Sequence, residues 1–307
     1  MEESLVSIII PSYNGSNKVA DAVNSVLTQT YSNVEVIVVD DNGIGTPEQK
    51  KTAESVAQFE ENSNFHYVTH ECNKHGSAAR NTGAKAAKGA YLGFLDDDDV
   101  YYPNYVQLHM DVHKTLEEEY ALTYCSSHQY RNDVLVKENI KSASGSLLYE
   151  VLMHKVVVGS TSLMIRKDAF DALGGFDESF RRHQDWEFTA RVAANYKVRA
   201  IEKIGFRRNL EYRNSPKNYE TAKNYRVHYI EKMMPYIKTL PKKQQKDVIA
   251  SNYVDVIMQL LRKRQFGKFI KEYREFKLGF YGVSFVLRAM YSYVFVNKNF
   301  WTLKKRK

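Results

Sequence analysis

The stretch GAYLGFLDDDDVYYPNYV, residues 89–106, places four consecutive aspartates, Asp96 to Asp99, directly after an apolar run of strand length. Like charges this close repel one another, and carboxylates are rarely buried without partners. A core strand that ends in four acids therefore predicts that this end of the strand holds a ligand or a cation.

Within the first hundred residues, short apolar runs alternate with segments of helix length. We expect strands at 5–10, 34–39, 65–69 and 90–95, and helices at 17–28, 47–61 and 75–89, the last capped by Gly76 or Ser77. This alternation is typical of βαβ units in a parallel, doubly wound sheet, where ligands bind beyond the carboxyl ends of the strands. Polar motifs end three of the strands: Ser12-Tyr13-Asn14, Asp40-Asp41 and Asp96–Asp99. The sequence thus predicts an α/β fold with its ligand at the aspartates.

The rest of the chain reads differently. After residue 120 the pattern is mixed, with strands expected at 122–127, 162–166 and 198–202 and a helix at 185–196. From about Ser215 the chain becomes helical, and residues 216–307 hold 21 Lys and Arg against 6 Asp and Glu, whereas residues 1–215 hold 23 against 30. We therefore expect two domains, 1–215 and 216–307, which meet different partners.

Composition limits the possible classes of protein. Apolar residues make up 43% of the 307, which is enough for a real core. The two cysteines, Cys72 and Cys125, are not spaced as a metal pair and suggest a reducing cytosol. The first residues lack the basic region of a secretory signal, so we expect a cytoplasmic protein.

The aspartates themselves suggest a divalent cation. Asp96 and Asp98 have the Asp-x-Asp spacing, and Mg²⁺ or Mn²⁺ is usually held by one or two carboxylates together with substrate phosphates. The simpler alternative is a solvated turn in which Asp99 caps a helix that begins near Pro103. Likewise Arg80, near the start of a helix, suits a pyrophosphate or a surface ion pair.

The order of the motifs extends this interpretation. With VSIIIPSYN, VIVVDDN, ARNTGAKAAKGAYLGFLDDDD, GGFDE and HQDWEF in succession, residues 4 to 205 resemble the family-2 inverting glycosyltransferases of the GT-A fold. The resemblance implies a Rossmann-like, doubly wound mixed sheet, followed here by a C-terminal helical, basic region. It also implies metal-dependent transfer of a sugar from a nucleotide-sugar.

The resemblance assigns the donor side residue by residue. Pro11 and Tyr13 match the nucleotide-base pocket, and Asp40 matches the carboxylate that accepts from uracil N3. Arg80 would contact the diphosphate. Of the acidic run, Asp96 would serve the ribose, Asp97 a second nucleotide contact, and Asp98 the metal. The alternatives are a strand stop at Pro11, a surface aromatic at Tyr13 and a turn aspartate at Asp40.

On the acceptor side, Asp185 matches the family's general base. Gln184 stands where the family usually has Glu and could hydrogen-bond the acceptor, with Trp186 beside it; Gly175 suits a tight approach to the sugar. The alternative makes Asp185 the N-cap of helix 185–196 and Trp186 a core residue. His109 and His113 have an i, i+4 spacing that can bind metal, but without the HExxH glutamate we expect them on a helix surface.

The segment 282–296, GVSFVLRAMYSYVFV, predicts an amphipathic helix, because Arg288 would be costly at the centre of a membrane span. The aromatic and basic residues after it suit the cytoplasmic face of an anionic membrane: Lys298, Phe300, Trp301, Lys304, Lys305, Arg306 and Lys307. The alternative is packing against the catalytic domain or within a homodimer.

Together these features predict a bacterial, metal-dependent (Mn²⁺ or Mg²⁺) inverting hexosyl- or N-acetylhexosaminyl-transferase. It would use a nucleotide-sugar, UDP-linked by expectation, and a glycan or lipid-linked acceptor in cell-surface polysaccharide (capsule) biosynthesis, at the inner face of the membrane. No nucleic acid is expected as a partner. Two alternatives remain: a non-catalytic polymer or nucleic-acid binder that uses the basic region, and a sugar nucleotidyltransferase, which would want a Gly-rich loop after the first strand.

Overall fold

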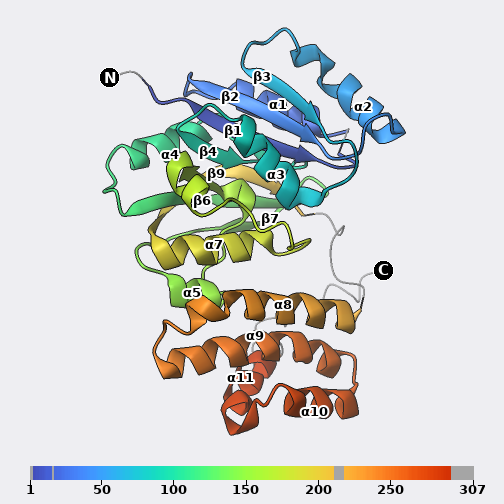
Figure 1. The fold of residues 1–307 in the computed structure, drawn as a ribbon, viewed down its shortest axis with the longest axis vertical. Helices are drawn as coiled ribbons and strands as arrows, with labels where there is room; N and C mark the ends of the chain where they lie inside the picture. Colours follow the sequence, from blue (N-terminus) through green and yellow to red (C-terminus); the bar gives the residue numbers. More distant parts are fainter. Residues whose placement is uncertain (1–2, 16, 211–217, 292–307) are drawn as a thin grey trace. The chain divides into compact units, whose positions relative to one another are not determined.

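The computed structural model describes residues 3–15, 17–210 and 218–291 (Figure 1). The chain divides into two compact units, one made of residues 1–151 and 156–212 and the other of residues 152–155 and 213–307. The domain border that the sequence predicts, at 215/216, falls within 211–217 and lies outside the described residues.

In its described part, the first unit contains a nine-stranded mixed sheet of order β3-β2-β1-β4-β8-β6-β9-β5, with β7 paired to β6 (Figure 1). The first four of these strands are mutually parallel, as expected: β1 (Val6–Ser12), β2 (Val34–Asp40), β3 (Phe65–Thr69) and β4 (Tyr91–Phe94). The second half runs mixed: β5 (Val100–Tyr101), β6 (Tyr120–Arg131), β7 (Val134–Asn139), β8 (Leu163–Arg166) and β9 (Lys197–Asn209). The α/β mixed-sheet prediction is confirmed.

The strands form where β-branched residues can be buried on both faces. β2, VEVIVVD, is buried along its whole length, and Ile8, Ile9 and Ile10 of β1 are fully buried. The helices of this unit are α1 (Val19–Leu27), α2 (Pro47–Val56), α3 (His75–Ala86), α4 (Tyr105–His113), α5 (Leu148–Leu152), α6 (Lys167–Ala172) and α7 (Gln184–Asn195).

Helix α3 is built from small residues because it packs closely on β1. A Cβ at Gly83 would lie 2.4 Å from Cγ2 of Ile9, so no larger residue fits without a shift. The predicted cap of this helix is wrong: its N-cap is Lys74, and His75 opens it with φ of +70°. Ser77 instead donates its hydroxyl to the carbonyl of Phe180 at 3.0 Å, a long-range contact that no local pattern announces.

The prediction for the histidine pair is also wrong. His109 and His113 of α4 are buried, not on a helix surface. The Oγ1 atom of Thr123 lies 2.6 Å from Nδ1 of His109 and 3.0 Å from Nε2 of His113. Burial lowers the pKa of His113 to about 4 and that of His109 well below its usual range. The pair is thus a neutral polar link between α4 and β6.

The described part of the second unit is helical, as expected, with α8 (Tyr219–Ile237), α9 (Lys242–Arg262), α10 (Phe266–Glu275) and α11 (Gly279–Tyr291) (Figure 1). Its core forms around Ile257 and Leu260 of α9. None of its described helices, nor any in the first unit's described residues, is long and apolar enough to cross a membrane. The amphipathic helix predicted at 282–296 is present as α11 up to Tyr291; residues 292–307, with the basic and aromatic cluster that follows, lie outside the described residues.

Candidate active site

The acidic run forms the loop that leaves β4, and its last member points inward. Asp99 is buried; its carboxylate accepts from the Oγ1 hydroxyl of Thr161 and from the backbone N–H of Asn209, both at 2.9 Å. Burial, reinforced by the charges of Asp96 and Asp98, raises the pKa of Asp99 well above its ordinary value. The capping role is excluded, because α4 begins at Tyr105 with Asn104 as its N-cap.

Asp97 ties the acidic loop to the end of β1. Its Oδ2 accepts from the Ser12 hydroxyl at 2.9 Å and from the Tyr13 backbone N–H at 3.3 Å. A Cβ at Gly15 would lie 1.7 Å from the same oxygen, so any larger residue there would displace the Asp97 carboxylate. Burial, together with the charges of Asp98 and Asp96, raises the pKa of Asp97 to about 6.

Asp96 pairs with Arg80 of α3. The Arg80 Nη2 donates to Asp96 Oδ1 at 2.5 Å, and the hydroxyl of Ser160 donates to the same oxygen at 3.2 Å. The arginine side chain is only 6% exposed, whereas the aspartate side chain is 36% exposed. The guanidinium is therefore buried, and the pair is not the surface ion pair of the alternative. The buried Nε of Arg80 has no hydrogen-bond partner among the described residues.

The loop offers the donor atoms that a hard cation prefers. Asp96, Asp97 and Asp98 are half-buried carboxylates. Burial is the main cause of the raised pKa of Asp97, the repulsion by Asp98 and Asp96 adds to it, and a divalent ion would relieve that repulsion. Among the described residues no group of three or more His, Cys, Asp or Glu side chains is arranged to hold a metal alone. A cation at this loop would therefore complete its shell with substrate phosphates and water.

The predicted pocket for the nucleotide base, at the ends of β1 and β2, is only partly open. Tyr13 is 55% exposed and Pro11 is half-buried. Asp40 is fully buried: Oδ1 accepts from the backbone N–H and side-chain Nδ2 of Asn42 at 2.9 and 2.8 Å, and Oδ2 accepts from the Tyr67 hydroxyl at 2.6 Å. The contact of Asp40 with a nucleotide base remains a prediction.

The predicted general base, Asp185, lies in the first turn of α7. The N-cap of this helix is His183, in the left-handed region with φ of +62°, and Gln184 is the first helical residue. Asp185 accepts from the N–H of Trp186 at 3.0 Å. Trp186 is half-buried and its ring stacks on His183 at 3.9 Å. Both alternatives are therefore wrong: Asp185 is not the cap, and Trp186 is not a core residue.

The electrostatics of Asp185 connect it with the acidic loop. Burial raises its pKa above the ordinary value, while the charges of Arg80 and Arg208 oppose the rise and that of Asp96 adds to it. Arg80 and Asp96 therefore act on Asp185 as well as on each other. Arg208, an exposed residue of β9, has no motif around it, and sequence reasoning missed it.

A buried ion pair fixes α7 to the glycine turn. Arg191 Nε lies 2.5 Å from Glu187 Oε1, and the same guanidinium donates to the carbonyls of Leu173 and Gly175 at 2.7 Å. Gly175 has φ of +72°, and a Cβ there would lie 2.6 Å from Asn81 Oδ1, so glycine is required. The only sequence signal for this pair is its i, i+4 spacing.

Comparison with known proteins bears on this arrangement. Residues 7–174, more than half of the chain, match the sequence profile described as Glycosyl transferase family 2, and they include β1, β2, α3 and the acidic loop. The chain belongs to this family.

Named relatives are consistent with this membership. This chain is 34% identical over 189 residues to an uncharacterised glycosyltransferase of Rickettsia prowazekii. The alignment covers 60% of this chain and 57% of that protein's length. It is 28% identical over 201 residues to WfgD of Escherichia coli, named as a UDP-Glc:alpha-D-GlcNAc-diphosphoundecaprenol beta-1,3-glucosyltransferase, covering 66% of this chain and 74% of WfgD.

Solved structures share the fold. S. aureus TarS 1–349 with UDP-GlcNAc has a TM-score of 0.57 and 17% identity, over 82% of this chain and 80% of that one. The mannosyltransferase PcManGT from Pyrobaculum calidifontis, with GDP-Man and Mn²⁺, has a TM-score of 0.59 and 12% identity, over 97% of this chain and 89% of that one.

Proposed function

We propose that this family-2 chain transfers one sugar from a nucleotide-sugar to a hydroxyl group of its acceptor, with inversion at the anomeric carbon. The observation that carries the proposal is the ion pair of Arg80 with Asp96, whose charges both act on the Asp185 carboxylate in the first turn of α7. A displacement at a sugar needs both parts, a site for the leaving diphosphate and a carboxylate for the incoming hydroxyl.

In the proposed reaction, Asp185 accepts the proton of the acceptor hydroxyl. The acceptor oxygen forms its bond to the anomeric carbon on the face opposite the diphosphate, and the bond from that carbon to the diphosphate oxygen breaks. Asp185 is a suitable base because burial raises its pKa, so that it binds a proton more readily than an ordinary aspartate.

The leaving group would be held by the acidic loop and by Arg80. Mn²⁺ or Mg²⁺ at Asp98, with Asp96 and Asp97 beside it, would neutralise charge that develops on the diphosphate. Arg80 supplies a buried guanidinium whose Nε still has no described partner, which suits a phosphate oxygen.

The donor's base would lie at Pro11, Tyr13 and Asp40. The acceptor would meet Gln184 and Trp186, which flank Asp185 in the sequence. It would also meet Gly175, whose carbonyl accepts from Arg191 of the same helix. Within this proposal, residues 1–215 form the catalytic domain and 216–307 a contact region for a membrane surface or a second copy.

The finer specificity is part of the proposal, and the relatives support it. WfgD is named for transfer from UDP-Glc to a diphosphoundecaprenol-linked sugar, and TarS binds UDP-GlcNAc in its complex, so we propose a UDP-linked hexose or N-acetylhexosamine as donor and a lipid-linked glycan as acceptor. We place the reaction in the assembly of a cell-surface polysaccharide, at the cytoplasmic side of the membrane.

A panel of nucleotide-sugars with Mn²⁺ tests the proposal, read as thermal shift and as slow release of nucleoside diphosphate. We expect one UDP-sugar to raise the melting temperature, and we expect EDTA and Asp98→Ala each to abolish the shift. Glu54→Ala, at an exposed acid of α2 outside the acidic loop, is the matched control and should leave the shift intact. Absence of a shift with every UDP-, GDP- and other nucleotide-sugar would overturn the proposal.

A further inference from the structure

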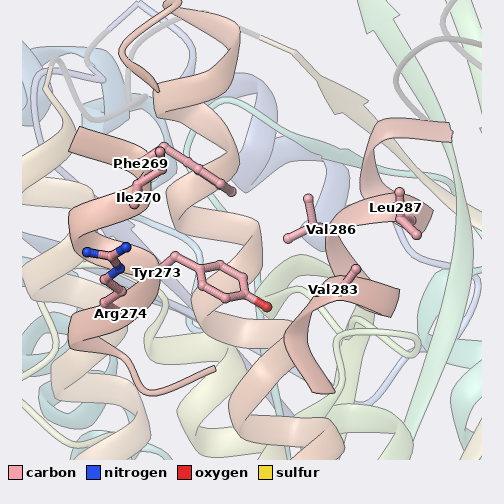
Figure 2. A pocket seen from close by; sticks show the side chains of 7 residues that line it. All are labelled: Phe269, Ile270, Tyr273, Arg274, Val283, Val286 and Leu287. Carbon is pink, nitrogen blue, oxygen red and sulfur yellow. The ribbon is translucent and has the colours of Figure 1, made fainter. Parts of the chain in front are cut away.

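A groove between α10 and α11 is lined almost wholly by hydrocarbon (Figure 2). Its volume is about 280 Å³, and its lining comes from both helices: Phe269, Ile270, Tyr273, Arg274, Val283, Val286 and Leu287. The inner members of this set, such as Phe269 and Val286, pack against the core of the unit. The outer members do not, since Ile270 is 50% exposed and Leu287 60% exposed.

The apolar surface continues beyond the groove. Phe266, one turn before Ile270 on the same face of α10, is 60% exposed. Met290, one turn after Val286 on α11, is 45% exposed. Scattered exposed apolar residues are ordinary, but a contiguous set on two adjoining helices marks an interaction surface.

Basic residues predominate around this surface. Residues 262–291 contain eight Lys and Arg and two acids, Glu272 and Glu275, and both acids are engaged by Lys223. Arg274 lines the groove itself and is exposed, and Lys271, about one turn earlier on α10, is also exposed. An occupant must therefore combine hydrocarbon with negative charge.

From these observations we infer that the α10–α11 groove is a docking surface for an anionic phospholipid membrane, with acyl chains against the groove and lipid phosphates against Arg274 and Lys271. A soluble small molecule fits less well, because such pockets carry several placed polar groups and this lining has almost none. The inference deepens one part of the proposed function, the membrane contact of residues 216–307, and its test measures binding, so it can fail without affecting the proposed catalysis. It differs from the sequence expectation in placing the contact on α10 as well as α11.

Co-sedimentation of the full chain with vesicles tests the inference. We expect binding to vesicles of phosphatidylglycerol with phosphatidylcholine, weakened by salt, and much weaker binding to pure phosphatidylcholine. Ile270→Ser with Leu287→Ser should lower the partition coefficient about tenfold or more, because two inserted side chains are lost. Arg274→Gln should weaken binding to the anionic vesicles about fivefold.

Matched controls come from the first unit. Val134 and Val136 of β7 are exposed by 63% and 48%, so Val134→Ser with Val136→Ser removes a comparable apolar surface elsewhere. Lys51→Gln, at an exposed position of α2, matches the Arg274 variant. Both controls should bind as the wild type does. All variants replace exposed side chains, so circular dichroism should show an unchanged fold.

A depth measurement locates the contact independently of the rest of the chain. The extra fluorescence of Ile270→Trp should be quenched by brominated lipid, and that of Val134→Trp should not. The inference is overturned if the wild type does not bind anionic vesicles, or if the groove double variant binds as well as the wild type. It is equally overturned if the double variant abolishes self-association of the chain while vesicle binding persists, since a second copy would then occupy the groove.

Discussion

The guanidinium of Arg80 and the carboxylate of Asp96 meet at 2.5 Å and join α3 to the loop that leaves β4. The sequence assigned these two residues to different parts of a nucleotide, the diphosphate and the ribose. Their pairing means that, without ligand, the guanidinium that we propose as the phosphate contact is held in place by the acid beside it. A bound diphosphate would then meet a guanidinium that is already oriented, which lowers the cost of binding.

Arg80→Lys tests the orientation rather than the charge. A lysine keeps the positive charge but lacks the planar fork that can contact Asp96 and a phosphate together. We expect kcat/KM for the donor to fall about a hundredfold, comparable to the loss of one preorganised donor to the developing charge. Steady-state kinetics measures this. Arg199→Lys, at an exposed position of β9, should leave kcat/KM unchanged; an equal fall there would show that the effect is not local.

Asp185→Asn separates catalysis from donor binding. The amide keeps the size of the side chain and can still accept from the N–H of Trp186, but it cannot take a proton. We expect kcat to fall by about 10²- to 10⁴-fold, the usual worth of a general base, with the thermal shift by the donor retained. A variant that keeps its turnover would remove Asp185 from the mechanism.

Arg208→Gln should move the pH profile. In the proposed reaction Asp185 must be ionised, so kcat/KM rises with pH as Asp185 loses its proton. Burial raises the pKa of Asp185 and the charge of Arg208 opposes that rise, so removing the charge raises the pKa further. We expect the acidic limb of the profile to shift to higher pH, and the shift to be modest because the charge of Arg208 is exposed and screened by solvent.

Arg199→Gln provides the control for that shift, because it removes the same kind of charge from the same strand. Its acidic limb should coincide with that of the wild type. If the Arg208 variant changes only the maximal rate and leaves the limb in place, Arg208 does not act on the base.

The parallel half of the sheet could be predicted from sequence because its signal is local. VEVIVV is short, β-branched and followed by a turn cluster, and the structure forms β2 there, at Val34–Asp40. β7 was missed because its side chains are exposed almost throughout, so that burial imposes no alternating pattern on VLVKEN. β5 has only two residues and exists through its pairing with β9.

The candidate site divides in the same way. The residue types at strand ends were visible, but which of the four aspartates turns inward depends on Thr161 and Asn209, far along the chain. The inward position of His109 and His113 likewise depends on Thr123 of β6. Spacing within a helix shows which residues share a face, and tertiary packing decides whether that face is buried.

Arg191→Met tests the support of α7. The change leaves the buried carboxylate of Glu187 without its partner, and breaking a buried pair from one side typically costs about 3–5 kcal/mol. We expect a loss of unfolding free energy near the lower end of that range, because the arginine is partly exposed. Denaturant unfolding measures it. Glu187→Leu combined with Arg191→Met should recover much of the loss; if the double variant is as unstable as the single one, the carbonyl contacts of Arg191 dominate instead.

The buried histidines of α4 make the stability of the first unit depend on pH. In the unfolded chain these imidazoles take up protons near pH 6.5, whereas burial lowers the pKa of His113 to about 4 and that of His109 further. The unfolded state therefore binds more protons between these values, and the stability present above pH 6.5 is lost as the pH falls towards 4. Each histidine contributes a slope of up to about 1.4 kcal/mol per pH unit.

The charged groups that face the pair matter too, since Arg166 also lowers the pKa of His113. We expect His113→Gln to remove its share of the slope, in urea unfolding followed from pH 7 to 5. If the His113 variant retains the wild-type slope, His113 is not buried in its neutral form, and the Thr123 bridge must be drawn differently.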